Sequence, residues 1–253
     1  VVENNKLPRD SYNLTLDNAP FAEESKTGVT DLVSAMIGNA TENISKEKFN
    51  EEIDFLGANI SFYESGASAN GLSRYSSRIL ELLADGALNP LFTQADFDAE
   101  RAKLIEGLKS DEKSASAIAA RVQNVLTYGK EHYNGEFTSE ETLKNVTLQD
   151  VINHYNTYFV PSNAYLVVIG DVKTADVKKK VEELFGADVW KKATAPNLTY
   201  NDPKDLQYSQ INFVDVPNAV QSEIALINLS KLKMNDKDYF AAILANQILG
   251  GGG

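Results

Sequence analysis

Few side chains in this chain have the types and spacing that catalysis or tight metal binding requires. His132 and His154 are its two histidines, and they are not three or four residues apart, as paired ligands on one helical face would be. We expect both to be ordinary structural or solvated residues. There is no cysteine, so disulfides, thiolate metal sites and a cysteine nucleophile are excluded. Asp31 and Glu106 alone would form a weak site for a hard cation and not a zinc–water site.

The candidate carboxylates lie on two predicted helices. Asp31 belongs to the apolar helix that runs from Gly28 to Ile37, and Glu106 to a helix that Thr93 caps. Hydrophobic spacing and turn residues predict further helices over 46–56, 76–88, 115–128, 148–158 and 174–185, and strands over 11–17, 60–63 and 164–171, the last of them fully buried. We expect a turn or tight crossing at Gly66–Gly71 that leads into a second strand, and a loop over 135–141.

The most specific pattern in the chain lies between Leu148 and Asp171. A helix with an acidic start ends in the pair Tyr158-Phe159 and is followed by Pro161-Ser162-Asn163-Ala164. A hydrophobic strand then leads to Gly170-Asp171. This pattern is typical of a fold, and its residues are not expected to take part in catalysis.

Together with the helix at Gly28 and the turn Leu56-Gly57-Ala58, this pattern resembles the pitrilysin/insulinase family of zinc metallopeptidases, the inverted zincins. The resemblance covers nearly the whole chain and implies an α+β fold with a mixed or antiparallel sheet and flanking helices. In that family the first helix carries H-x-x-E-H, whose two histidines bind zinc while the glutamate activates water. A glutamate on a later helix is the third ligand.

In this sequence the corresponding positions have lost those groups. The motif falls on residues 31–35, which places Asp31 and Ala35 at the two histidines and Ser34 at the glutamate. The third ligand falls on Gly107, with Glu106 beside it, so that a slip of one residue would restore a glutamate. We therefore predict no catalytic residue and no metal ligand in this chain, with zinc expected only in an active partner.

The resemblance also implies a candidate for peptide binding. In active relatives an edge strand holds extended substrate by strand addition. The residues at that position here are Asn59, Ile60, Ser61, Phe62, Tyr63 and Glu64.

Composition limits the other classes of function. The chain has 253 residues, 43% of them hydrophobic, so it can bury a full core. Its formal net charge of -12 argues against a nucleic-acid binder, which would normally show a basic patch. No window approaches the roughly 20 apolar residues of a membrane span.

The chain divides into two unequal parts. We predict a complete pitrilysin-like domain over 1–192, a linker rich in Asn, Pro, Thr and Lys over 193–206, and the start of a second homologous domain over 207–253. In that second copy, 211–214 and 222–227 read as strands and 237–249 as a helix. Two strands and a helix cannot bury enough surface to fold alone, so we expect a truncated copy or one that another chain completes.

Three functions are consistent with the sequence. The first is a non-catalytic subunit or half of a pitrilysin-type peptidase, which forms chamber wall and binds extended peptides beside an active subunit or fused active half. The second is an active zinc metalloendopeptidase with unrecognised ligands, and the third is a purely structural scaffold subunit. If the protein is bacterial, we expect it in the periplasm or cell envelope.

Overall fold

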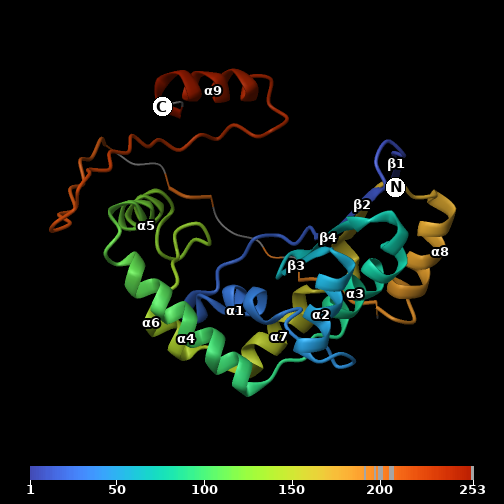
Figure 1. The fold of residues 1–253 in the computed structure, drawn as a ribbon. Helices are drawn as coiled ribbons and strands as arrows, with labels where there is room; N and C mark the ends of the chain where they lie inside the picture. Colours follow the sequence, from blue (N-terminus) through green and yellow to red (C-terminus); the bar gives the residue numbers. More distant parts are fainter. Residues whose placement is uncertain (191, 197, 199–201, 205–207, 252–253) are drawn as a thin grey trace.

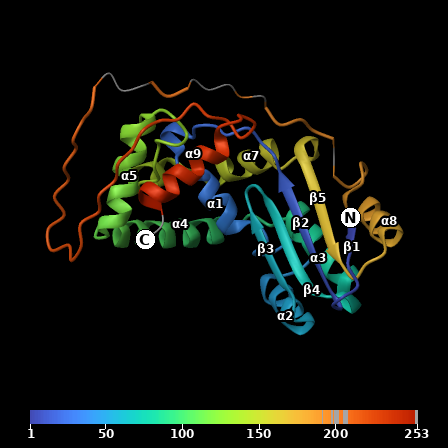
Figure 2. The ribbon, with the colours of Figure 1, turned by 90° about the horizontal axis from the view of Figure 1, so that it is seen from above.

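The first part of the chain folds around one mixed sheet. The computed structural model describes residues 1–190, 192–196, 198, 202–204 and 208–251. The sheet has five strands in the order β1-β5-β2-β4-β3, namely β1 (Val2–Glu3), β5 (Ala164–Gly170), β2 (Arg9–Leu16), β4 (Gly66–Leu72) and β3 (Asn59–Tyr63). The pairing of β1 with β5 is parallel and the other three pairings are antiparallel. The predicted α+β fold is confirmed (Figures 1 and 2).

Some of the helices pack on one face of this sheet, and the others lie beyond its β3 edge (Figure 2). The helices are α1 (Val29–Met36), α2 (Lys46–Leu56), α3 (Ser76–Leu88), α4 (Gln94–Asp111), α5 (Ala115–Tyr128), α6 (Glu140–Asn145), α7 (Leu148–Tyr158) and α8 (Thr174–Phe185). Along β2 the buried residues alternate with exposed ones, so Tyr12 and Leu14 enter the core. Phe49 of α2, Ile79 of α3 and Val177 of α8 complete that core.

A second core holds the helix that carries positions 31–35. It joins Leu32 of α1 to Phe97 of α4, Leu143 of α6 and Val151 of α7. This core fixes α1 beside α4, the two helices on which the family places its zinc ligands.

Three local predictions in this part were wrong. Residues 66–71 form most of β4 and not a turn, because Ala67 and Ala69 alternate inward under the helices. The expected loop over 135–141 contains the start of α6, which Ser139 caps. The strand β5 is buried on one face only; Tyr165, Val167 and Ile169 remain 42–60% exposed, because no helix among the described residues covers the outer face of the sheet at this strand.

The second part of the chain forms one helix. The predicted strands over 211–214 and 222–227 are not formed, and Ile211 and Leu226 are fully exposed. A strand needs a neighbour that satisfies its backbone groups, and the part of the chain described here provides none for these segments. The predicted helix is present as α9 (Tyr239–Asn246), which continues into a π-helical turn, Gln247–Gly251. Much of the predicted linker (197, 199–201, 205 and 206) and the last two glycines lie outside the described residues.

Candidate functional site

The N-terminus of α1 is held by two glutamates. Glu23 accepts hydrogen bonds at its two carboxylate oxygens from the backbone N–H groups of Gly28 (2.6 Å) and Thr30 (3.1 Å). Glu136 in turn accepts from the backbone N–H groups of Glu23 (2.7 Å) and Glu24 (3.0 Å). Burial raises the pKa of Glu23, and the nearby carboxylate of Glu136 adds to the effect. These bonds leave no local sequence pattern, because Glu23 lies five residues before Gly28 and Glu136 more than a hundred residues after it.

The side chains at the first two functional positions of α1 bind other parts of the protein. Asp31 accepts a hydrogen bond at Oδ2 from Thr138 Oγ1 at 2.9 Å. Ser34 Oγ accepts the backbone N–H of Glu64 at 3.0 Å, at the end of strand β3. Burial raises the pKa of Glu64, and the neighbouring Asp31 carboxylate also raises it. The two positions therefore serve to anchor a loop and a strand.

The remaining positions supply no ligand. Ala35 has no donor atom, and Gly107 is exposed on α4, where an added Cβ would contact nothing within 4 Å. Glu106, beside it, is exposed and forms an ion pair with Lys109 at 2.7 Å.

This donor set does not fit a catalytic zinc. Such a site needs three nitrogen, sulfur or carboxylate ligands and an open position for water. The four positions offer one carboxylate, which is already hydrogen-bonded, and one hydroxyl, which accepts an N–H. Within the part of the chain that the structure describes, no three His, Cys, Asp or Glu side chains gather closely enough to hold a metal ion. We derive no chemical step through zinc.

The two histidines lie in aromatic surroundings. His154 on α7 packs against Phe21 and Tyr158, with ring centroids 5.4 and 4.7 Å away, and burial lowers its pKa to about 4. The ring of His132 stacks on Tyr128 and Tyr133, and its Nδ1 accepts the backbone N–H of Asn134 at 3.1 Å.

Strand β3 is an edge of the sheet. It pairs with β4 over its whole length, from Asn59 opposite Asn70 to Tyr63 opposite Gly66, and its other side has no neighbouring strand among the described residues. The side chains of Asn59, Ser61 and Tyr63 are exposed, while Ile60 and Phe62 turn inward. The edge therefore has the geometry that strand addition requires, and Ser34 holds its end against α1.

Comparison with known sequences places two profiles of one family along the chain. The profile "Insulinase (Peptidase family M16)" matches residues 19–138, and the profile "Peptidase M16 inactive domain" matches residues 145–253. A probable mitochondrial-processing peptidase subunit beta of Arabidopsis thaliana is 22% identical over 200 residues, which are 77% of this chain and 38% of that protein.

Solved structures show the same fold. A peptidase M16 inactive domain from Pseudomonas fluorescens superposes with a TM-score of 0.78 at 20% identity and covers all of this chain. A protease from Helicobacter pylori gives a TM-score of 0.68 at 17% identity over 81% of this chain. The chain spans 61% and 54% of the length of these two relatives. No helix among the described residues is long and apolar enough to cross a bilayer.

Proposed function

Because this chain belongs to the peptidase M16 (insulinase/pitrilysin) family, with its N-terminal domain and part of its inactive domain, we propose that it is a non-catalytic member that works beside an active, zinc-bearing partner. In this role it forms part of the wall of the peptidase chamber and binds extended peptides. The partner is a second subunit or an active half fused to the same chain.

One observation carries the proposal. The helices α1 and α4 pack together in one core, yet the positions at which the resemblance puts the catalytic motif and third ligand hold Asp31, Ser34, Ala35 and Gly107. Two of these side chains bind other parts of the protein, and the other two have no donor atom. The packing of the two helices is therefore retained although the catalytic groups are absent. This combination is expected of a subunit that forms part of the chamber wall or binds peptide.

The exposed apolar side chains of residues 208–251 also support the proposal that the chain has a partner. The apolar side chains of Phe240 and Leu244 on α9, and of Ile248 in the turn after it, are 64–84% exposed. Ile211, Phe213, Val220 and Ile224 are exposed as well. Exposed apolar surface of this extent marks a site of protein contact. The plant relative carries the word subunit in its name, which fits a heteromeric assembly.

The test is a binding measurement with an unstructured peptide. Fluorescence anisotropy should show saturable binding without cleavage, and a peptide of the same sequence with alternate backbone amides N-methylated should bind much more weakly, because it cannot add to the β3 edge. Equal binding of the two peptides would exclude strand addition. Chelator-sensitive cleavage by this chain alone would overturn the proposal, and no peptide binding together with a stable non-peptidase partner would favour a scaffold.

A further inference from the structure

Strand β3 has few inward-facing side chains that can hold it on the helices. The side chains of Asn59, Ser61 and Tyr63 are exposed, and only Ile60 and Phe62 turn toward the core. The strand pairs with β4 alone, so its other side forms no ladder with any strand among the described residues. A segment with few buried contacts opens easily, so the position of this edge depends on its two inward side chains.

The ring of Phe62 lies in a slot between two helices, and a glycine lies at each wall. A Cβ added at Gly38, in the turn that follows α1, or at Gly86, inside α3, would overlap the ring. On a third side lies the ring of Phe49 from α2, with its centroid 6.2 Å away and its plane tilted by 44°. Phe62 therefore packs against α2, α3 and the turn that ends α1.

The sequence of α3 carries a cost that this slot explains. Gly86 lies inside a 13-residue helix, where glycine is a poor helix former. An isolated glycine in a helix usually has a packing or functional reason, and here the reason is that a larger residue would leave no room for the ring. Gly38 has a φ of +75°, in the left-handed region, so glycine suits its backbone as well as the ring.

A hydrogen bond ties the same end of β3 to α1. Ser34 Oγ accepts the backbone N–H of Glu64 at 3.0 Å, one residue after the strand ends. Glu64 and Phe62 are two residues apart, so the bond and the ring hold the same stretch of backbone. The position of the edge is therefore set by α1 and the turn after it.

We propose that Phe62 is a positioning residue for peptide binding, because its ring, held between Gly38 and Gly86, fixes β3 in the arrangement to which an extended peptide adds. This inference rests on the proposed function, since it concerns the same edge. A strand that is already ordered loses less conformational entropy when a peptide binds to it. The side chain of Phe62 turns inward and does not face the peptide, so it acts through the backbone of β3.

The test compares Phe62→Leu with the unaltered chain in two measurements. Fluorescence anisotropy gives the dissociation constants of the unstructured peptide and of its N-methylated form, and amide exchange followed by NMR gives the mobility of β3. Leucine leaves part of the slot empty, so the amides of residues 59–63 that are protected in the unaltered chain should exchange faster. The unmethylated peptide should bind about tenfold more weakly, and its advantage over the N-methylated form should shrink.

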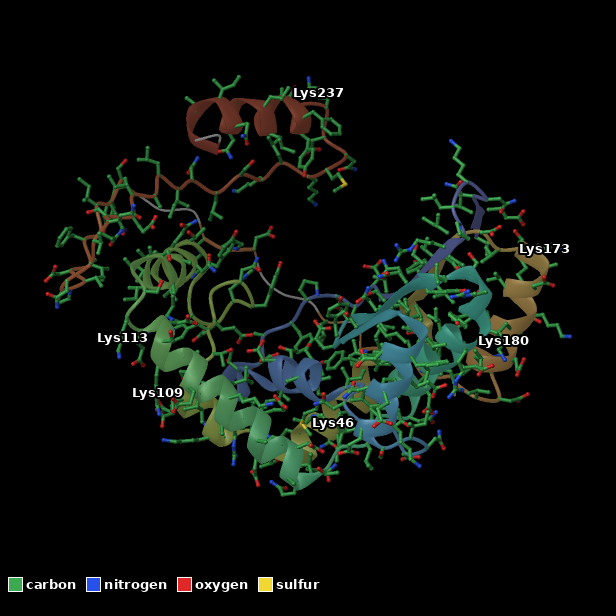
Figure 3. All side chains as sticks on the ribbon, viewed as in Figure 1. Lys46, Lys109, Lys113, Lys173, Lys180 and Lys237 are labelled. Atoms are coloured by element: carbon green, nitrogen blue, oxygen red, sulfur yellow. The ribbon has the colours of Figure 1, made fainter. Side chains whose placement is uncertain are left out.

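Phe185→Leu is the matched control. Phe185 is also a partly buried aromatic residue of the same core, with its ring centroid 6.2 Å from that of Trp190. It lies on α8, which Figure 2 shows beside β1, at the opposite edge of the sheet from β3, and which Lys173 and Lys180 mark in Figure 3. This variant should lose stability and leave both the peptide affinity and the exchange of β3 unchanged. All variants are measured without denaturant, after circular dichroism has shown that they are folded.

A compensating pair separates positioning from a general loss of stability. Gly86→Ala narrows the slot and should weaken peptide binding, and adding Phe62→Leu should restore part of the affinity, because the smaller side chain fits the narrower slot. Should Phe62→Leu alone fail to fold, Phe62→Met, which fills the slot with a flexible side chain, takes its place.

The two measurements also keep this inference distinct from the proposed function. Unchanged exchange in β3, or unchanged peptide affinity, in a folded Phe62 variant would overturn the inference. Equal binding of the two peptides by the unaltered chain would instead overturn strand addition, and the exchange rates would then decide whether Phe62 fixes the strand.

Discussion

Ser34 of α1 accepts a hydrogen bond from the backbone N–H of Glu64 at 3.0 Å, and this bond joins the degenerate helix to the end of the edge strand β3. The resemblance predicts that Ser34 stands where the water-activating glutamate of the motif would be. Its hydroxyl instead holds the end of the edge strand β3 in place.

Removing the Ser34 hydroxyl should loosen the end of β3. In Ser34→Ala the amide of Glu64 loses its acceptor, so we expect it to exchange with solvent faster and the free energy of unfolding to fall by about 1 kcal/mol. NMR measures the exchange rate of the Glu64 amide, and urea unfolding measures the free energy of unfolding. Ser25→Ala, which removes an exposed hydroxyl from the 3₁₀ turn Glu24–Lys26, should change neither. An unchanged Glu64 exchange rate would show that the bond does not form.

Restoring three ligands should create a zinc site. In the triple variant Asp31→His, Ala35→His and Gly107→Glu, the resemblance predicts that two imidazoles on α1 and a carboxylate on α4 act as ligands, and we expect about one zinc per chain. The new side chain at Gly107 meets no neighbour, so the fold should tolerate it. Zinc is measured by elemental analysis after dialysis.

The double variant Asp31→His and Ala35→His is the matched control for the register of α4. It keeps Gly107 and Glu106 and should bind zinc much more weakly than the triple variant. Equal affinity would mean that Glu106 supplies the third ligand and that the alignment of α4 is shifted by one residue.

Gly86 in α3 should resist the substitution that usually stabilises a helix. A Cβ there would overlap the ring of Phe62 on β3, so Gly86→Ala should lower the free energy of unfolding by roughly 1–3 kcal/mol, although alanine is the better helix former. Phe62→Leu in the same chain should recover part of the loss. Urea unfolding of the two single variants and the double variant gives the coupling energy. A stabilising Gly86→Ala would contradict the packing of β3 on α3.

His154 should make the protein less stable in acid. Burial lowers its pKa from 6.5 to about 4, so the unfolded chain binds more protons than the folded chain between those values. The stabilisation is complete above pH 6.5 and is lost as the pH falls toward 4, by an amount on the order of 3 kcal/mol. His154→Phe should remove this part of the pH dependence in urea unfolding at pH 5 and 7.5. His132→Phe should retain it, because His154 is still present, and equal slopes for both variants would contradict the assignment.

The sequence predicted the elements that carry strong local signals. The helices α2, α3, α5, α7 and α8 have the predicted bounds, because each combines apolar spacing with a stop signal such as Asn89-Pro90 or Gly129. It predicted a second strand but placed Gly66–Gly71 in the turn before it, because Gly66, Ala67 and Ala69 resemble a turn in composition. These residues form β4 by packing between β2 and β3. Strands over 211–214 and 222–227 were predicted from alternation, which cannot tell whether a neighbour is present.

The candidate site was less predictable than the fold. A resemblance places Asp31, Ser34, Ala35 and Gly107 but says nothing of the bonds that these residues make. The bonds that Glu136 accepts from Glu23 and Glu24, and the bond from Thr138 to Asp31, join segments more than a hundred residues apart. Such contacts follow from tertiary packing and leave no local pattern.

The most direct test is the zinc content and peptidase activity of the unaltered chain, purified, mildly dialysed and then incubated with an unstructured peptide with and without added zinc. We expect zinc near zero per chain and no cleavage in either condition. Zinc near one per chain, or cleavage that a chelator abolishes, would contradict the assignment of a non-catalytic member and would make Asp31, Glu106 and the two histidines the first residues to mutate.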